Sequence, residues 1–233
     1  MKGIAALACA LSLSLSTAHA DGSHELARED SEIIVRTDRA GLFSFAGHRH
    51  RILVEEFTAE ISAPAPREPL AIDVVIDALS LTVIDDDLDA EKIAEVQAEM
   101  ESSVLEVETH PAIRAALVLA ALPDGDGAFN VELRGDLTLH GTTREVVVPA
   151  TLLLAGRRLQ VRGTAVVKQT DYGIRPVSVG KGAVKVKDEV EIDFSLVSFA
   201  PLVEVLDEGK GSPNVESVEE AGAAPAHADS TDR

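Results

Sequence analysis

Histidines are the first residues of this sequence whose types and spacing could support chemistry. His48 and His50 lie two positions apart, so their side chains point to the same face of an extended strand. A zinc site needs three or four protein ligands. His110 and His140 are the other histidines of the central region, and nothing in their spacing places them near this pair. We therefore predict no metal site and interpret His48 and His50 as surface or rim histidines.

A second candidate is an acidic run that imitates the start of a calcium loop. Asp85, Asp87 and Asp89 alternate as the first ligands of an EF-hand do. That loop also needs Gly at its sixth position and Glu at its twelfth, and these positions hold Ala90 and Val96. Helix capping explains the acids better, because negative charge near the start of a helix is favourable.

Catalytic motifs are incomplete wherever they begin. Residues 176–180 (Pro-Val-Ser-Val-Gly) hold half of a nucleophile elbow but lack its leading Gly, and no strand-turn-helix pattern follows. His24 and Glu25 lack the second histidine of a zinc protease. The isolated glycines are typical of hairpin turns rather than of a phosphate-binding loop. We therefore predict a protein that is not an enzyme and carries no cofactor.

Charge and composition exclude further classes. The 233 residues contain 21 Lys and Arg against 40 Asp and Glu, which gives a net charge of −19. This charge repels nucleic-acid phosphates and anionic membranes alike. Six Phe, one Tyr and no Trp are too few for a platform that stacks bases. The hydrophobic 45% of the chain is mostly aliphatic, and it argues against a wholly disordered protein.

The first twenty residues have the pattern of a secretory signal peptide. Lys2 is followed by an apolar run over 4–15 and by the small-residue site Ala18-His19-Ala20. We expect cleavage after Ala20 and export to the periplasm. A lipid anchor on Cys9 is the alternative, which the short apolar run before Cys9 disfavours.

The mature chain has features of a soluble exported protein. It lacks cysteine beyond the leader, so it forms no disulfide. Its longest apolar stretch, 115–122, is far shorter than the ~20 residues of a spanning helix, so no stable membrane anchor is expected. Residues 21–30 and the acidic segment 200–233 have little to bury, and we expect a short flexible N-terminus and a disordered tail around a folded domain over 31–199.

Alternating apolar and polar residues dominate this domain and predict strands. The pattern is clear over 57–61, 72–76, 129–139 and 190–196, and weaker over 32–37, 41–47, 112–122, 144–155 and 158–168. Short loops between the segments favour antiparallel hairpins.

One segment, 90–105, instead has helical periodicity, with Ile93, Val96, Met100 and Val104 on one face. We predict an all-β fold, an antiparallel eight-stranded barrel with this one inserted helix. A barrel of that size holds its own side chains or one small ligand.

Three stretches show a resemblance to a known family. Residues 135–144 (Gly-Asp-Leu-Thr-Leu-His-Gly-Thr-Thr-Arg) resemble the G-x-L-T-x-H-G-x-T-R hairpin of YceI-like, polyisoprenoid-binding proteins. Residues 170–174 with 186–192 resemble the closing segment of that family, and 47–52 its histidine-bearing second strand. The resemblance spans about 33–197 and departs at His110, where an aromatic residue commonly precedes the proline. It implies a lipocalin-like barrel that holds a long isoprenoid or a similar lipid.

The lumen is therefore the expected binding site. Its predicted ligand-binding residues are Phe43, Phe45, Phe57, Ile61, Val74, Ile76, Met100, Leu117, Leu133, Gly135, Leu137, Tyr172, Ile192 and Phe194. We expect the missing side chain of Gly135 to leave space for the ligand. Tyr172 has two interpretations: its hydroxyl contacts a ligand head group, or the side chain pins the neighbouring loop to the barrel.

The sequence thus favours an exported carrier of a long-chain isoprenoid or related lipid, of polyprenyl or quinone type. The alternative is a protein-interaction module with an inert, filled barrel, which docks partners through the acidic tail or the histidine strand. Whether the chain is a monomer or a homodimer stays open at this point.

Overall fold

Most of the described chain is extended strand, as the alternation predicts. The computed structural model describes residues 23–40, 49–63, 65–179 and 184–200, and all belong to one unit, Met1–Pro201. The strands are β1 (Ser23–Leu26), β2 (Glu32–Ala40), β3 (His50–Val54), β4 (Phe57–Ser62), β5 (Leu70–Asp77), β6 (Leu81–Val83), β7 (Ala112–Leu119), β8 (Gly127–Leu139), β9 (Thr142–Ala155), β10 (Arg158–Lys168), β11 (Ser178–Val179) and β12 (Val184–Phe199). The strand expected over 41–47 lies outside the described residues.

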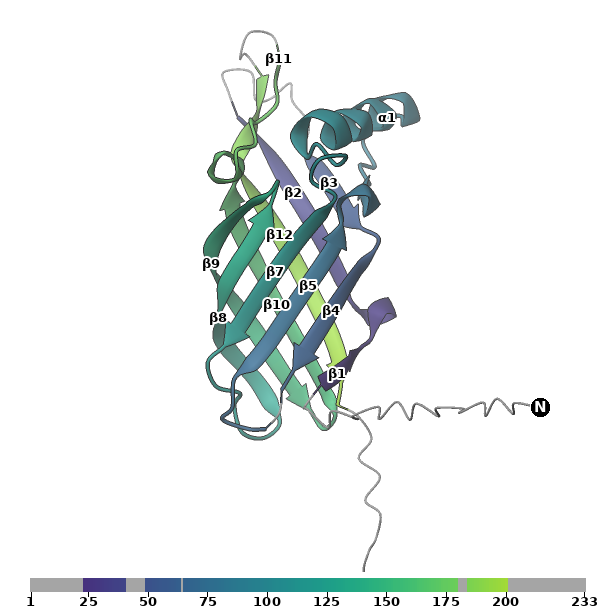
Figure 1. Cartoon of the computed structure of the whole chain (residues 1–233). Coiled ribbons are helices and arrows are strands. Elements are labelled where there is room, and N and C mark those ends of the chain that lie inside the picture. Colours follow the sequence, from purple (N-terminus) through teal and green to yellow (C-terminus); the bar gives the residue numbers. More distant parts are fainter. Residues whose placement is uncertain (1–22, 41–48, 64, 180–183, 201–233) are drawn as a thin grey trace, which may run out of the picture. The chain divides into compact units, whose positions relative to one another are not determined.

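Antiparallel pairing closes these strands into a barrel (Figure 1). The ring runs β1-β4-β5-β7-β8-β9-β10-β12, and β12 pairs back with β1. In β1, His24 lies opposite Ile61 of β4, and Glu25 lies opposite Phe199 of β12. The expectation of a flexible N-terminus is wrong for Ser23–Asp30, which forms β1 and the short helix η1 (Arg28–Asp30). The predicted antiparallel barrel is confirmed.

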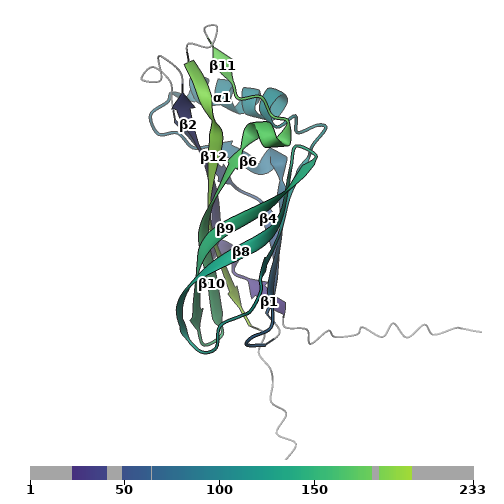
Figure 2. The same ribbon diagram turned by 90° about the vertical axis from the view of Figure 1, so that its left-hand side faces the viewer.

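The wall changes towards the other end of the barrel. There β12 pairs with β2, β2 with β3, and β3 with β6, which ends the sheet. Three breaks make this change: residues 27–31 separate β1 from β2, residues 55–56 separate β3 from β4, and the short helix η3 (Ala78–Ser80) separates β5 from β6. Beyond β6 the chain reaches α1 (Ala90–Glu99), which lies at the end of the barrel opposite β1 (Figures 1 and 2).

The predicted helix over 90–105 is confirmed with one irregularity. The α-helix stops at Glu99, and a single π-helical turn, η4 (Met100–Val104), follows it. Asp89 is the N-cap, as expected, and its carboxylate accepts a 2.8 Å hydrogen bond from the Lys92 amide. We call α1 and η4 together the cap segment. No helix among the described residues is long and apolar enough to cross a membrane.

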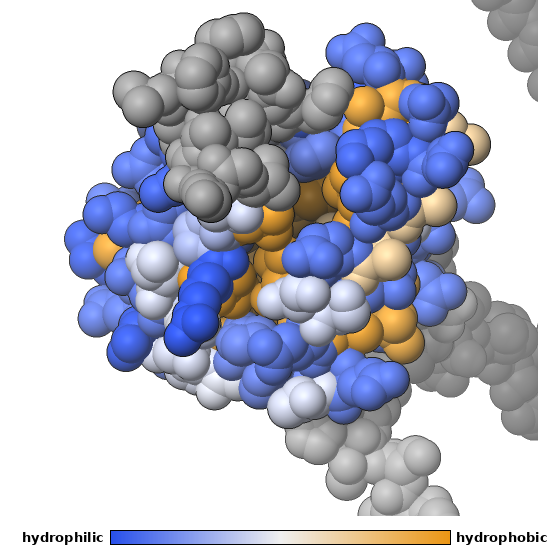
Figure 3. Space-filling view, turned by 90° about the horizontal axis from the view of Figure 1, so that it is seen from above, coloured by the Kyte–Doolittle hydropathy of each residue, from blue (hydrophilic) through white to orange (hydrophobic). Residues whose placement is uncertain are grey.

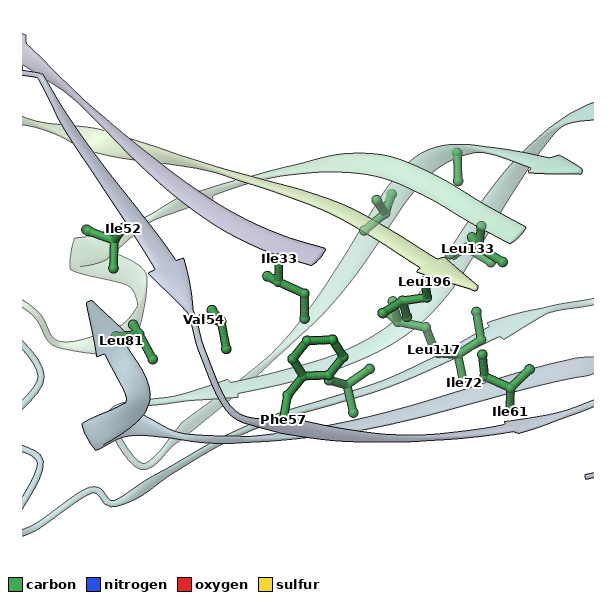
Figure 4. Packing of buried hydrophobic residues seen from close by; sticks show 14 of the residues in the cluster. Ile33, Ile52, Val54, Phe57, Ile61, Ile72, Leu81, Leu117, Leu133 and Leu196 are labelled. Atoms are coloured by element: carbon green, nitrogen blue, oxygen red, sulfur yellow. The ribbon is translucent and has the colours of Figure 1, made fainter. Parts of the chain in front are cut away.

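The hydrophobic core is densest where the ring is closed by β1. Leu70, Leu133, Leu152, Val161 and Val197 are all 0% exposed there. Figure 4 shows Ile61 and Leu133 directed into this interior from β4 and β8. We call this end of the barrel the filled half, and the end beneath the cap segment the cavity half.

A candidate lipid-binding cavity and a histidine cluster

An apolar cavity of ≈170 Å³ occupies the cavity half. Its walls come from nearly every strand of the barrel, and η4 contributes Met100 and Val104 from the cap segment. Seen from above, the same end of the molecule shows hydrophobic surface recessed between hydrophilic residues (Figure 3). The interior of the barrel is therefore hollow at one end and filled at the other.

Aliphatic side chains make up almost the whole lining. Thr37 and Gln169 are the only polar side chains among the described residues that line it. Gln169 is buried, and its amide nitrogen donates a 2.8 Å hydrogen bond to the Lys187 carbonyl. A ligand in this cavity would find apolar contact along its length and two neutral polar groups.

Half of the predicted lumen residues line this cavity. They are Val74, Ile76, Met100, Leu117, Leu137, Ile192 and Phe194. Besides Thr37 and Gln169, the lining residues that the prediction did not include are Ile33, Val35, Ile52, Val54, Ile72, Leu81, Val104, Leu105, Ile113, Ala115, Leu139, Val146, Val148, Ala165, Val167, Ile174, Val190 and Leu196. Many of these residues lie on the inward-facing side of the predicted strands. Extending the alternating pattern along each strand is therefore enough to find them.

The remaining predicted residues lie elsewhere. Ile61 and Leu133 are fully buried in the filled half. Phe57 is buried as well, and the guanidinium of Arg28 lies over its ring at 4.1 Å from the centroid. Phe43 and Phe45 lie outside the described residues.

Gly135 offers no free space, so the expectation for this position is wrong. It does lie in the inward row of β8, between Leu133 and Leu137. A Cβ atom added to it, however, would stand 1.9 Å from the carbonyl oxygen of Ala116 on β7. The glycine therefore allows a close approach of two backbones rather than leaving room for a ligand.

Tyr172 occupies a position that favours the second of its two interpretations. Only 2% of it is exposed, and it belongs to a small cluster with Leu137, Val167, Ile174 and Val190 beside the cavity. Burial raises the pKa of its hydroxyl, and the nearby Asp171 carboxylate adds to this effect. The side chain fastens the helical turn η5 (Gln169–Tyr172) to the barrel, and it does not line the cavity.

The histidines separate into two groups. His50 lies with its Nδ1 atom 2.6 Å from the carboxylate of Asp85, which also accepts a 2.7 Å hydrogen bond from the Arg51 amide. Asp85 is therefore held by β3, and Asp89 alone of the acidic run caps the helix. His48 lies outside the described residues.

The second group joins residues whose spacing along the chain does not suggest a common site. The rings of His110 and His140 have centroids 4.2 Å apart, with an angle of 53° between their planes. The Nε2 atom of His140 stands 3.7 Å from a carboxylate oxygen of Glu106. These three side chains come from the end of the cap connection and from the β8–β9 turn, which only the fold brings together.

Comparison with known proteins now places the chain. A solved polyisoprenoid-binding domain from Saccharophagus degradans superposes with a TM-score of 0.56 at 14% identity, and covers 78% of this chain and 99% of its own. BcnA from Burkholderia cenocepacia gives a TM-score of 0.53 at 21% identity, over 74% of this chain and 99% of BcnA.

Sequence comparison adds a partial match and a family. A UPF0312 protein from Pseudomonas fluorescens is 39% identical over 56 residues, which cover 22% of this chain and only 28% of that relative. The model of the YceI-like domain matches residues 26–198, which contain β2 to β11 in full and β12 as far as Ser198. The chain therefore belongs to the YceI-like domain family.

Proposed function

We propose that this protein binds the apolar chain of an isoprenoid or related long-chain lipid in the barrel cavity and carries it. The observation that supports this most is the cavity itself, which lies inside the barrel and is lined by apolar side chains apart from Thr37 and Gln169. The solved relative described as a polyisoprenoid-binding domain shares this fold.

The driving force would be hydrophobic. Each buried CH₂ group contributes roughly 0.8 kcal/mol, so about ten buried carbons give several kcal/mol after the costs of ordering. The ≈170 Å³ volume compares with engineered apolar cavities of about 150 Å³ that bind one benzene molecule. A short slender segment therefore fits the side chains as they stand, and a longer chain requires them to move apart.

The cap segment is the part of the lining best suited to such movement. Met100 contributes an unbranched side chain that adapts to irregular shapes. Val104 and Leu105 follow it into the cavity from the same side. We infer that a ligand longer than the present cavity displaces these three side chains rather than the paired strands.

The polar lining favours an uncharged head group. Thr37 and Gln169 offer a hydroxyl and an amide, and no cationic side chain lines the cavity among the described residues. A phosphate would therefore lose its hydration without gaining a charged partner, which is costly. Alcohol or quinone head groups fit this surface better.

Export completes the proposal. The first twenty residues carry the charge, apolar run and Ala-x-Ala site of a leader, which supports release of a soluble periplasmic carrier. Protein secreted by a Gram-negative host should then begin at Asp21 on N-terminal sequencing. A chain that keeps its leader, or that carries lipid on Cys9, would contradict this part.

The interaction-module alternative requires an inert, filled barrel, and the cavity half is not filled. Of its two docking elements, the acidic tail lies outside the described residues, and the histidine strand is described only from Arg49 onwards. Deleting residues from Ala200 onwards distinguishes the two functions, because a carrier keeps its ligand without the tail and a tail-dependent docking protein loses its partner.

A matched pair of substitutions on β7 tests the carrier function. Ala115 lines the cavity, whereas the adjacent Ala116 is exposed on the outer face. Mass spectrometry of organic extracts should find a lipid in native-purified wild type and in Ala116→Leu. It should find little in Ala115→Leu, whose thermal melt should still be cooperative. A wild type without lipid, together with strong destabilisation by Ala115→Leu, would overturn the proposal.

A further inference from the structure

Three potential metal ligands meet beside the cap segment. One carboxylate oxygen of Glu106 and one ring nitrogen each of His110 and His140 all lie within 4.8 Å of one another. Glu106 and His110 belong to the connection between η4 and β7, and His140 belongs to the turn between β8 and β9. The group therefore bridges the cap connection and the barrel wall.

Local backbone geometry supports this arrangement. His140 and Gly141 both have positive φ, 49° and 70°, and Leu139 pairs with Thr142, as in a two-residue type I′ hairpin turn. The absent side chain of Gly141 makes room for His110, because a Cβ atom there would stand 3.0 Å from the imidazole ring. Glu106 also has positive φ, 47°. Two of the three ligand-bearing residues thus hold a backbone conformation that few non-glycine residues adopt.

A second observation points to a ligand at this place. The Nε2 atom of His140 is buried and has no hydrogen-bond partner among the described residues. Its nearest anionic neighbour, the Glu106 carboxylate, stands at 3.7 Å, which is too long for a hydrogen bond. Two ligands on one tetrahedral zinc ion, with bonds of about 2.0–2.2 Å, lie roughly 3.3 Å apart. An ion between these groups would satisfy both with small side-chain rotations.

We propose that Glu106, His110 and His140 form a binding site for a divalent transition-metal ion of the Zn²⁺ class. Imidazole nitrogen with carboxylate oxygen suits zinc, copper, nickel or iron, whereas magnesium and calcium prefer ligands made of oxygen alone. Three protein ligands leave one coordination position of a tetrahedral ion open to water. Glu106 is exposed, so the ion can reach the site from solvent.

The site would also fasten the cap segment. Leu105 precedes Glu106 directly and lines the cavity, and Met100 and Val104 of η4 line it as well. A metal ion bound by both Glu106 and His140 would therefore link this part of the cavity lining to the β8–β9 turn. This consequence rests on the proposed lipid-binding function, and it predicts slower release of bound lipid when the metal is present. The metal site itself does not depend on that function.

Calorimetric titration of the metal-free full chain with Zn²⁺ near neutral pH tests the site. Wild type should bind one ion. His140→Asn and His110→Gln should each weaken the affinity at least about tenfold. Asparagine is chosen at position 140 because it tolerates positive φ better than most residues do. His50→Gln serves as the matched control, since His50 contacts Asp85 in the other histidine group.

A second measurement separates lost binding from lost folding. Zn²⁺ should raise the melting temperature of wild type and of His50→Gln, should raise that of His110→Gln clearly less, and should have a larger effect than Mg²⁺. The proposal is overturned by a wild type that does not bind Zn²⁺, or by binding that survives in His110→Gln and disappears in His50→Gln. Lipid extraction from the same samples shows independently whether the carrier function holds.

Discussion

The two halves of the barrel are built from the same kinds of residue and differ in how their strands are paired. In the filled half, β1 pairs with both β4 and β12, and the ring has no open edge. In the cavity half, the sheet ends at β6, which pairs with β3 alone among the described strands. The closed ring has a dense interior, and the interrupted ring has the cavity. The cavity therefore lies at the end of the barrel where the ring of strands is interrupted.

A side chain takes the place of the missing strand at the open edge of β6. Gln97 of α1 accepts a 2.9 Å hydrogen bond from the Val83 amide and donates one of 2.8 Å to the Leu81 carbonyl. The Val83 amide and the Leu81 carbonyl belong to residues two positions apart. A neighbouring β-strand binds backbone groups with this spacing. The cap segment is thereby attached to the sheet by an amide that can detach, whereas the filled half is held by continuous backbone pairing.

The largest expected effect contrasts one substitution in the two halves. Leu133 and Leu139 stand on the same face of β8, but Leu133 is 0% exposed in the filled half and Leu139 lines the cavity. Leu133→Ala should reduce the free energy of unfolding by about 2–5 kcal/mol, because the closely packed neighbouring side chains cannot move in to fill the cavity that the substitution leaves. Leu139→Ala should cost clearly less in the same urea titration. Equal losses would mean that the two halves are equally well filled.

Gly135→Ala examines the junction between β7 and β8. The new Cβ atom would overlap the Ala116 carbonyl, so the strands must separate, at a cost of roughly 1–3 kcal/mol. Thermal and urea unfolding should show this loss, while Asp136→Ala, an exposed change on the same strand, should be nearly neutral. A Gly135→Ala protein as stable as wild type would show that the backbones are not in close contact.

Gln97→Ala tests the attachment of the cap segment. Loss of two hydrogen bonds to β6 should cost about 1–2 kcal/mol and should expose the Val83 amide to faster hydrogen exchange. Lys92→Ala, which removes only the exposed contact of Lys92 with Glu95, should leave that amide protected. If Val83 stays equally protected in both variants, the amide bridge does not hold the cap.

The smallest expected effect is a pH dependence that arises in β1. Burial lowers the pKa of His24 below the ordinary value of 6.5, so the folded state favours the neutral imidazole. As pH falls through about 6.5, the unfolded chain binds the proton first, and the free energy of unfolding decreases until the folded pKa is reached. His24→Gln should flatten this slope between pH 7 and 5 in urea titrations. If the free energy of unfolding of His24→Gln depends on pH as strongly as that of wild type, another group causes the pH dependence.

Much of the barrel could be predicted from the sequence because one face of each long strand is buried. β8 shows this best, since its apolar residues alternate without interruption from Phe129 to Leu139. β1 was missed because its four residues, Ser-His-Glu-Leu, are too few to establish a period. The extent of the cavity could not be predicted either, because Leu133 and Leu139 are equivalent in the pattern and differ only in the pairing around them.

The Glu106, His110 and His140 group had no signal in spacing. His110 precedes β7 and His140 follows β8, so a β-hairpin sets the two rings side by side at one end of the barrel. A prediction that paired β7 with β8 in register could have brought the two histidines together. The position of Glu106 depends on the π-helical turn and its exit, for which the sequence carries no comparable pattern.

Closure of the ring by β1 has a consequence for how the chain folds. The first strand pairs with the last, and the Ser31 hydroxyl accepts a hydrogen bond from the Val197 amide across a separation of 166 residues. Contacts of such high order cost loop-closure entropy before they give any stabilisation, so they slow folding. The barrel can close only after synthesis has reached β12. Until then the aliphatic strands of the growing chain lack their final partners. Unpaired strand edges and exposed hydrophobic surface make such a chain prone to aggregation.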